Sequence, residues 1–311
     1  MRFSLILLSI LTSSPCIAGD IIYDRITKDK VSSGQVEYFV KGKKTGANAN
    51  ILCEDGLFYN DSYIAVFDGA TDKSGRLYDG KKGGQVARDL IFNVFKELPS
   101  DADHKEILNQ INDAYHDFYN SHPDIDFSNK ALFRPTATLI WYSFAHKKLY
   151  AIGDSKARID GVEFNKKSKF VDVLNSFLRV KVITDLKLSE SDVAKNDIGR
   201  YYIQPLLERQ SEFQNNPQAP IYFQYWAIDG FSIPDEAISK WDFDKTPSVI
   251  ELSTDGYEEF PPDSSVESYE KTLFKILSND PQRIKSPSTK GLKNGDASFD
   301  DRSILIYTRG H

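Results

Sequence analysis

The chain has few cysteines that could form disulfides and few apolar segments that could cross a membrane. Only two of its 311 residues are cysteines, Cys16 and Cys53, so no internal disulfide can form if the segment carrying Cys16 is removed. Beyond that segment, no apolar run is long enough to span a bilayer as a helix. The sequence also has no repeat, heptad pattern or low-complexity tract. The fold must therefore depend on its hydrophobic core, which a chain of this length can build.

Positive charge is also in short supply. The chain has 39 basic and 45 acidic residues, giving a formal net charge of −6 at pH 7. This balance argues against a surface that binds polyphosphates or nucleic acids. The short lysine runs lack the interleaved aromatic residues that would stack on bases. We expect no nucleic-acid partner, no membrane contact for the mature chain, and a monomer.

The amino terminus resembles a secretory signal peptide over residues 1–18. Arg2 precedes the apolar stretch "LILLSILT", and the small residues of "PCIAG" follow, with a cut expected after Ala18. A lipid anchor on Cys16 and an ordinary buried strand or helix are the alternatives. We therefore expect an exported protein, periplasmic or secreted, with delivery into a host cell as a further option, whose residues 19–311 form a single domain.

Hydrophobic periodicity predicts an alternation of strand and helix blocks. Apolar residues recur at helical spacing in 83–98 and 107–118, and strands are expected at 136–144, 148–154, 247–256 and 302–308. The stretch 165–214 reads as mainly helical, with Ser189 and Asp192 as a capping pair. Strands in hairpins with helices in separate blocks predict an α+β fold of antiparallel sheets covered by helices, rather than a doubly wound parallel sheet.

Acidic residues mark the ends of four predicted strands. The apolar stretch "IAVFDGA" stops at Asp68, and Asp154, Asp255 and the Asp300–Asp301 pair lie at the ends of three others. Carboxylates brought together at one sheet edge repel one another unless a cation lies between them. Oxygen-only ligands favour magnesium, manganese or calcium over zinc. The alternative is that these acids serve turns and helix caps.

Six short motifs, in order and over most of the chain from about Val36, resemble those of the PP2C-type (PPM) metal-dependent protein serine/threonine phosphatases. They are "CEDG" (53–56), "VFDGA" (66–70), "RPTATLIW" (134–141), "YAIGDSKAR" (150–158), "LSTDGY" (252–257) and "FDDRSILIY" (299–307). The resemblance implies a sandwich of two antiparallel sheets flanked by helical layers, with a two-metal site at one edge.

The same resemblance implies roles for individual residues. Asp68 would bridge both metal ions, and the carbonyl of Gly69 would bind one of them. Asp255 and Asp300 would complete the second site and, with Asp68, would form the catalytic set. The remaining expected metal or metal-water ligands are Glu54 and Asp55, Asp154 for a weaker third ion, and Asp301 as a secondary candidate.

The implied chemistry is hydrolysis of phosphate monoesters. Two Mn²⁺ or Mg²⁺ ions would activate a bridging hydroxide for in-line attack on phosphorus and neutralise the phosphoryl oxygens. The expected substrates are phosphoserine and phosphothreonine in proteins, or a small phosphoester. One alternative is a metal-binding pseudophosphatase that acts as an interaction module. Another, a metal-dependent nuclease, lacks the basic groove that nucleic acid requires.

The sequence departs from the family pattern at several positions. Ala70 stands where many eukaryotic members have a histidine that can protonate the leaving group. Asn50 lies near the position of a phosphate-binding arginine, for which Lys43, Lys44 or Arg134 could substitute. Lys156 replaces a frequent arginine, and the link from Ala70 to the first helix is long.

Two further segments have alternative interpretations. Asp229 and Gly230 in "WAIDGF" are predicted to form a turn, because no family metal motif falls there. A helical insertion at about residues 166–244 could shape substrate choice or serve as scaffold, and we favour scaffold.

Overall fold

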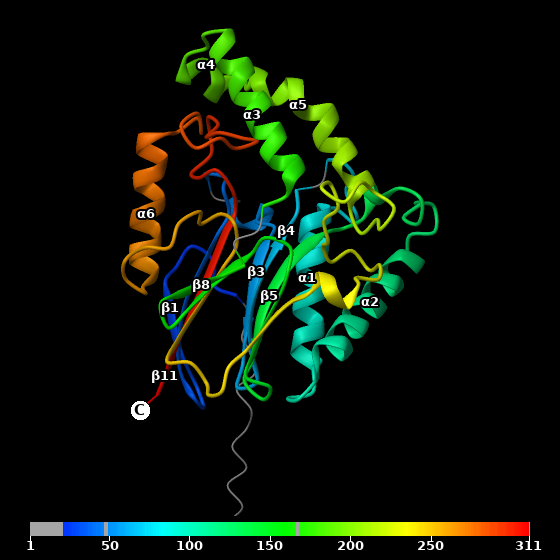
Figure 1. Cartoon of the computed structure of the whole chain (residues 1–311), viewed down its shortest axis with the longest axis vertical. Helices are drawn as coiled ribbons and strands as arrows, with labels where there is room; N and C mark the ends of the chain where they lie inside the picture. Colours follow the sequence, from blue (N-terminus) through cyan, green and yellow to red (C-terminus); the bar gives the residue numbers. More distant parts are fainter. Residues whose placement is uncertain (1–20, 47–48, 72, 166–167, 311) are drawn as a thin grey trace, which may run out of the picture.

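Two antiparallel β-sheets face each other across a shared apolar layer (Figure 1). The structure, a computed structural model, describes residues 21–46, 49–71, 73–165 and 168–310, so the expected signal peptide and Cys16 lie outside the described residues. The six-stranded sheet has the order β1 (Thr27–Val31), β2 (Gly34–Lys41), β11 (Arg302–Arg309), β10 (Val249–Ser253), β7 (Lys156–Ile159) and β8 (Val162–Phe164). The five-stranded sheet has the order β3 (Asp55–Tyr59), β4 (Tyr63–Gly69), β5 (Ala137–Ser143), β6 (Lys148–Ile152) and β9 (Ser239–Asp242).

Helices cover the outer face of each sheet. On the five-stranded sheet they are α1 (Gly83–Glu97) and α2 (His104–Asn120), and on the other α6 (Val266–Asn279). The helices α3 (Phe170–Asp185), α4 (Glu190–Lys195) and α5 (Ile198–Arg209) stand above one end of the sandwich (Figure 1). Short 3₁₀ helices occupy η1 (Ala49–Leu52), η2 (Ala131–Phe133), η3 (Gln210–Phe213) and η4 (Asp235–Ala237). The predicted α+β sandwich flanked by helical layers is confirmed.

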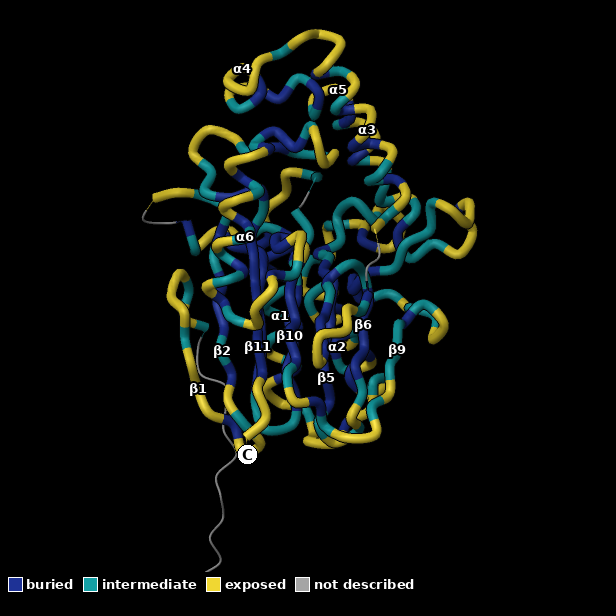
Figure 2. Tube along the Cα trace, turned by 60° about the vertical axis from the view of Figure 1, so that its left-hand side comes forward, coloured by how far each residue is buried: buried dark blue, intermediate teal, exposed yellow. Residues whose placement is uncertain are grey.

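Strand β4 shows why its sequence reads as a continuous apolar run. Side chains alternate between the faces of a strand, so Ile64 and Val66 enter the layer between the sheets. Ala65 and Phe67 point to the opposite face and contact the core beneath α1 and α2. Both faces are buried, as Figure 2 shows for the central strands, and a strand buried on both faces has no need of alternating polarity.

The helix boundaries follow from caps that the sequence carries. The side chain of Asp103 accepts hydrogen bonds from the backbone of Lys105 and Glu106 at the start of α2. Ser189 and Asp192 form the reciprocal capping box that was predicted for the start of α4. The predicted helical character of residues 165–214 is confirmed by α3, α4 and α5 within its described part. No helix among the described residues has the length and apolarity needed to cross a bilayer.

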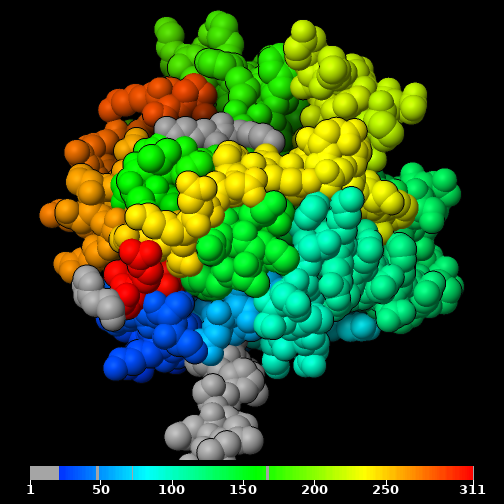
Figure 3. Space-filling model, turned by 60° about the horizontal axis from the view of Figure 1, so that its bottom comes forward, coloured from blue at the N-terminus to red at the C-terminus, as the bar shows by residue number. Residues whose placement is uncertain are grey.

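The helical insertion leaves the sandwich after β8 and returns at β9, two edge strands of different sheets. Their aromatic side chains meet across the gap. The ring of Phe164 lies 5.5 Å from that of Trp241 and 5.8 Å from that of Phe243. At the far end of the sandwich, the blue amino-terminal strands and the red carboxy-terminal residues lie side by side (Figure 3), in agreement with the pairing of β2 and β11.

Candidate functional site

The end of the sandwich beneath the helical insertion holds a cavity of about 1040 Å³. Its floor is made by strand ends of both sheets, and its wall includes residues of α3 and α5. Side chains of the insertion thus line the cavity, which favours the alternative that it shapes substrate choice; its role stays a prediction. Five of the predicted site residues line it too: Asp68, Gly69, Asp154, Asp255 and Asp300.

The sheet register explains how the acids reach this place. Asp68 follows Ile64 and Val66 on the inner face of β4, and in the register it lies opposite Asp55 of β3 and Thr138 of β5. Directly opposite residues have Cβ atoms about 4.5–5.5 Å apart, and like charges in such a pair destabilise a sheet. The row of Asp55, Asp68 and Thr138 therefore places unfavourable negative charge at one end of strands β3, β4 and β5.

Asp55, a member of this row, connects the two sheets. It is buried, with 2% of its surface exposed, and its Oδ2 accepts a hydrogen bond of 2.6 Å from Oγ1 of Thr254, just beyond β10. Burial, and then repulsion from Asp301, raises the pKa of Asp55 well above its usual value. Asp55 does not line the cavity, its hydrogen bond to Thr254 connects the two sheets, and its expected role as a ligand stays a prediction.

Asp301 has its oxygens committed to the backbone. Oδ1 accepts from the backbone N–H of Lys43 at 2.7 Å, and Oδ2 accepts from that of Glu54 at 2.8 Å. Asp301 is 3% exposed and does not line the cavity. These contacts make it a residue that positions the ends of neighbouring segments, and its proposed secondary role as a ligand stays a prediction.

Glu54 is the second buried acid of the early pair. Its Oε2 accepts a hydrogen bond of 3.1 Å from Oγ1 of Thr71, whereas its Oε1 is buried without a hydrogen-bond partner. Burial raises the pKa of Glu54, although Lys43 opposes the change. A buried carboxylate oxygen without a partner costs free energy, so this atom is free to accept a cation or a water molecule.

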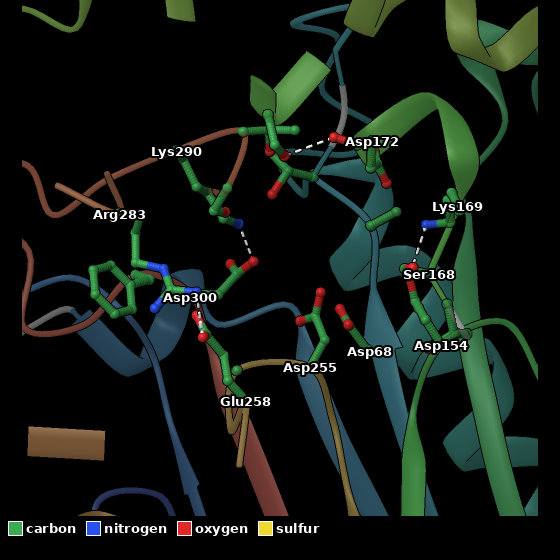
Figure 4. Close-up of a pocket in the computed structure, with 18 of the residues that line it drawn as sticks. Asp68, Asp154, Ser168, Lys169, Asp172, Asp255, Glu258, Arg283, Lys290 and Asp300 are labelled. Atoms are coloured by element: carbon green, nitrogen blue, oxygen red, sulfur yellow. Dashed lines mark hydrogen bonds and ion pairs between the residues drawn. The ribbon is translucent and has the colours of Figure 1, made fainter. Parts of the chain in front are cut away.

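Asp68 and Asp255 point into the cavity side by side (Figure 4). Desolvation, followed by repulsion from Asp255, raises the pKa of Asp68 well above its usual value. Desolvation, followed by repulsion from Asp300 and Asp154, raises the pKa of Asp255 to about 6. The two carboxylates come from β4 and from the turn after β10, and their mutual repulsion is not relieved by any ion pair to either within the described residues.

Asp300 differs from these two acids because lysines hold it. Nζ of Lys43 lies 2.8 Å from its Oδ1, and Lys290 donates to its Oδ2 (Figure 4). Burial alone would raise the pKa of Asp300, but Lys290 and Lys43 override it and hold the pKa well below its usual range. Asp300 is thus ionised and neutralised by the chain itself.

Asp154 lies at the opposite side of the cavity, after β6. Its Oδ2 is 3.3 Å from Nζ of Lys169, the residue immediately before α3. Burial works against the charge of Lys169, but Asp154 and Asp172 raise its pKa well above the usual value. The predicted third-metal acid is therefore paired with a lysine of the insertion.

Gly69 brings backbone to the site at close range. A Cβ at this position would lie 2.3 Å from the carbonyl oxygen of Gly84 and 2.5 Å from that of Glu54. Only glycine therefore permits the end of β4 to approach the start of α1 and the start of β3. This approach places the backbone of residue 69 directly beside the acids of the floor.

The donor set suits a hard divalent cation. It consists of carboxylate and carbonyl oxygens, which magnesium and manganese prefer, and it includes the unpartnered Oε1 of Glu54. As the described side chains stand, no three acids, histidines or cysteines converge closely enough to enclose an ion. Asp300, one of the expected ligands, contacts Lys43 and Lys290 instead of joining the other acids. The residues fit such ions provided that Asp300 turns from its lysines.

Two candidate phosphate-binding residues have other partners. Nη1 of Arg134 lies 3.2 Å from Oδ2 of the fully buried Asp229, and its guanidinium lies 3.5 Å from the ring centre of Phe231. Arg134 does not line the cavity, so it cannot replace the missing arginine. Lys44 lines the cavity but pairs with Asp296 at 2.7 Å.

Asp229 lies in the predicted turn and also makes contacts with residues outside it. It lies before Gly230, which has a φ of +78°, and it accepts from the backbone of Phe231. Its carboxylate also accepts from Gln214 at 2.8 Å and from Asn215 at 2.6 Å. The turn prediction is confirmed, and the buried acid also joins the end of the insertion to the rest of the fold.

Comparison with known proteins gives structural likenesses only. No family model and no curated protein matches the sequence. Among solved structures, the serine/threonine phosphatase PstP/Ppp of Mycobacterium tuberculosis is 14% identical, with 89% of this chain and 99% of that chain covered and a TM-score of 0.45. The phosphatase Stp1 of Staphylococcus aureus is 13% identical, with 93% and 100% covered and a TM-score of 0.45. RsbX, solved with magnesium, is 12% identical, with 92% and 100% covered and a TM-score of 0.43.

Proposed function

We propose that this chain is a metal-dependent phosphatase of the PP2C type that hydrolyses phosphate monoesters, chiefly phosphoserine and phosphothreonine in proteins. The observation that carries the proposal is the charge arrangement of the cavity. Asp68, Asp255 and Asp300 form an acidic floor, and lysine and arginine side chains surround them. A site that binds divalent cations at the floor of a cavity and a phosphate ester over them needs acidic residues at the floor and basic residues around it.

The acids of the floor are the ligands that we assign to two Mn²⁺ or Mg²⁺ ions. Asp68, Asp255 and Asp300, with the carbonyl of Gly69, would hold them, and Glu54 would contribute its free oxygen or orient a bound water. When bound, such ions supply the positive charge that activates water and stabilises the phosphoryl oxygens in the transition state.

The protein's own groups restrain the acids. Thr71 fixes Glu54 through its hydroxyl, and Lys43 approaches the same hydroxyl at 3.4 Å. Ala70 offers no proton to the leaving group, so an alkoxide must take its proton from water or from a neighbouring ammonium. Phenolic esters, which leave as stabilised anions, should therefore react faster than phosphoserine.

The chain is also proposed to be exported and monomeric. The features that support export are Arg2, the apolar stretch after it and the small residues before Gly19. Fractionation of the producing cell, with amino-terminal sequencing of the product, tests both the export and the cut after Ala18. Recovery of the uncut chain from the cytoplasm alone would refute the proposal. Light scattering of the purified product tests the monomer.

The activity is tested with the mature chain from Gly19. Hydrolysis of para-nitrophenyl phosphate and of a phosphothreonine peptide is measured with manganese and with chelator. Activity that requires manganese on both substrates supports the phosphatase. Absence of turnover on both, with manganese bound, refutes it.

The second candidate function is a pseudophosphatase that binds but does not hydrolyse. The observation that favours it is the double lysine contact of Asp300, which occupies an acid needed for a metal. Binding of a phosphothreonine peptide without turnover, under conditions in which manganese is bound, would select this candidate.

A further inference from the structure

Positive side chains from three separate segments gather above Asp300. Lys73 comes from the segment between β4 and α1, Arg200 from the first turn of α5, and Lys293 from the segment between α6 and β11. All three line the cavity. We call Lys73, Arg200 and Lys293 the cationic rim.

Lys73 is connected to the acidic floor through one threonine. Nζ of Lys43 lies 2.8 Å from Asp300 and 3.4 Å from Oγ1 of Thr71. Nζ of Lys73 donates to the backbone carbonyl of the same Thr71 at 2.7 Å. Lys73 and Lys43 thus contact the same residue, Thr71, and Lys43 in turn contacts Asp300.

Arg200 is connected to the floor in the same manner from the other side. Lys290 donates to Oδ2 of Asp300, and its neighbour Thr289 accepts a hydrogen bond of 2.7 Å from Nη1 of Arg200 through its backbone carbonyl. Arg200 therefore stands next to the second lysine that holds Asp300. The two short chains of contacts bring the rim to the edge of the proposed catalytic centre.

Within the described residues, the rim side chains have no ion pair to a carboxylate, as is also true of Lys156, whereas the other bases that line the cavity have one. Lys169 pairs with Asp154, Arg283 with Glu258 and Lys44 with Asp296. The side chains of Lys73 and Arg200 each donate a hydrogen bond to a neutral backbone carbonyl, that of Thr71 and that of Thr289 respectively.

The rim charges also repel one another. Burial, and then Lys290, Arg200 and Lys169, lowers the pKa of Lys73 to about 8, with Asp172 opposing the change. Burial also lowers the pKa of Arg200, and Arg179 reinforces this change while Asp197, Asp300 and Asp172 oppose it. Gathering cations in a partly buried place without partners costs free energy that an anionic ligand would recover.

We propose that the cationic rim is a second anion subsite, which binds an acidic group on a residue flanking the phosphorylated one. The favoured substrates are then acidic or multiply phosphorylated phosphopeptides. Val173 and Phe177 of α3 and Leu207 of α5 line the same wall, so apolar side chains are available to contact the intervening peptide. The proposal rests on the proposed phosphatase function, because the first phosphate must occupy the floor.

The test compares three phosphothreonine peptides of equal length. One has neutral neighbours, one has a glutamate on each side, and one has a phosphoserine on each side. Hydrolysis by the wild-type chain with manganese is compared with that of the K73Q/R200Q variant. The wild type should prefer the acidic peptides, and the variant should raise their KM about tenfold, the range of one or two charged hydrogen bonds, with the neutral peptide and para-nitrophenyl phosphate changed less than about twofold.

The matched control is Lys181→Gln. Lys181 is an exposed lysine of α3 that pairs with Asp185, so its replacement changes the net charge without touching the rim. It should leave the preference intact. Arg200→Lys should restore part of the preference, because it returns the charge but not the planar fork of donors. If the double variant does not fold by thermal melting, Lys73→Gln alone carries the comparison.

Binding separates failure of this proposal from failure of the proposed function. Fluorescence anisotropy of the labelled peptides is measured in the same variants with manganese. Preferential binding of the acidic peptides that disappears in K73Q/R200Q, without any turnover, supports the subsite and refutes the phosphatase. Turnover with equal KM for neutral and acidic peptides, or a preference that survives in K73Q/R200Q, overturns the subsite. The glutamate and phosphoserine peptides distinguish a carboxylate from a phosphate as the second anion.

Discussion

Nζ of Lys43 lies 2.8 Å from Oδ1 of Asp300, and Lys290 holds the other oxygen of the same carboxylate. Burial works to lower the pKa of Lys43, but Asp300, Asp301 and Glu54 raise it well above the usual value, so the ammonium keeps its charge. An acid expected to bind a metal is therefore already neutralised, and cation binding at Asp300 must compete with two lysines.

The first prediction concerns this competition. Lys290→Gln should tighten manganese binding roughly threefold to tenfold, since it removes a positive charge next to the cation. Isothermal titration calorimetry measures the affinity. Lys44→Gln is the matched control, because Lys44 pairs with Asp296 and not with Asp300. Unchanged or weaker binding in Lys290→Gln would show that Lys290 positions Asp300 for the metal instead of competing with it.

The second prediction tests the site itself. Asp68→Asn should reduce manganese-dependent hydrolysis of para-nitrophenyl phosphate at least about 100-fold, because an amide cannot neutralise two cations. The fold should persist, since the variant relieves repulsion in the row with Asp55. Circular dichroism and thermal melting check the fold, and Asp263→Asn, at an exposed position, is the control. Near wild-type activity in Asp68→Asn would remove the assignment.

The third prediction concerns pH and metal together. The pKa of Asp255 is raised to about 6 and that of Asp68 is raised well above its usual value. Raised carboxyl pKa values mean that the folded state binds protons more tightly than the unfolded one. In the presence of chelator, the metal-free protein therefore loses stability as pH rises from about 4 through about 6.

Manganese should restore this lost stability. The manganese-induced rise in Tm should be small at pH 5 and larger at pH 7.5, where Asp255 is ionised in the absence of metal. Melting curves at both pH values, with manganese and with chelator, measure it. The same rise at both pH values would contradict the assigned carboxylates as the metal ligands.

The fourth prediction concerns the buried contact of Arg134 with Asp229. Asp229→Ala should lower the free energy of unfolding by about 3–5 kcal/mol, because it leaves the arginine buried without its partner. Denaturant unfolding measures the change. Asp185→Ala breaks the exposed pair with Lys181 and should cost less than about 1 kcal/mol. A small loss in Asp229→Ala would mean that solvent reaches Arg134.

The fifth prediction concerns the charge of Lys73. Its pKa of about 8 reflects burial and the charges of Lys290, Arg200 and Lys169, with Asp172 opposing them. Lys73 therefore loses its proton as pH rises through about 8, and the preference for acidic over neutral peptides should decline between pH 7 and 9. Lys73→Arg should keep the preference across this range, because arginine stays protonated. A preference in the wild type that does not change with pH would exclude Lys73 from the subsite.

The acidic floor could be predicted from the sequence because its residues follow regular elements. Asp68 ends an apolar strand, so the alternation of side chains decides which face it takes. Asp255 and Asp300 lie beside strands that the sequence marks by their apolar runs. In contrast, β1 was not predicted, because four of its five side chains are not buried and an edge strand shows little hydrophobic pattern.

The basic residues of the cavity could not be predicted in the same way. Lys290 lies in the irregular segment between α6 and β11, where no periodicity indicates a direction. Its side chain contacts Asp300 because of the course that this irregular segment takes. Arg200 shows the same difficulty on a helix, since its helical spacing predicts a face of α5 but not that this face looks toward Thr289.

The contact of Phe164 with Trp241 has a consequence for how this chain can vary. The strands that precede and follow the helical insertion are joined at its base, so the number of residues between them is not constrained by either sheet. A longer, shorter or different segment there would add only a slowly growing closure entropy. This junction is therefore a place where a segment of different length could replace this wall of the cavity while the acidic floor is kept.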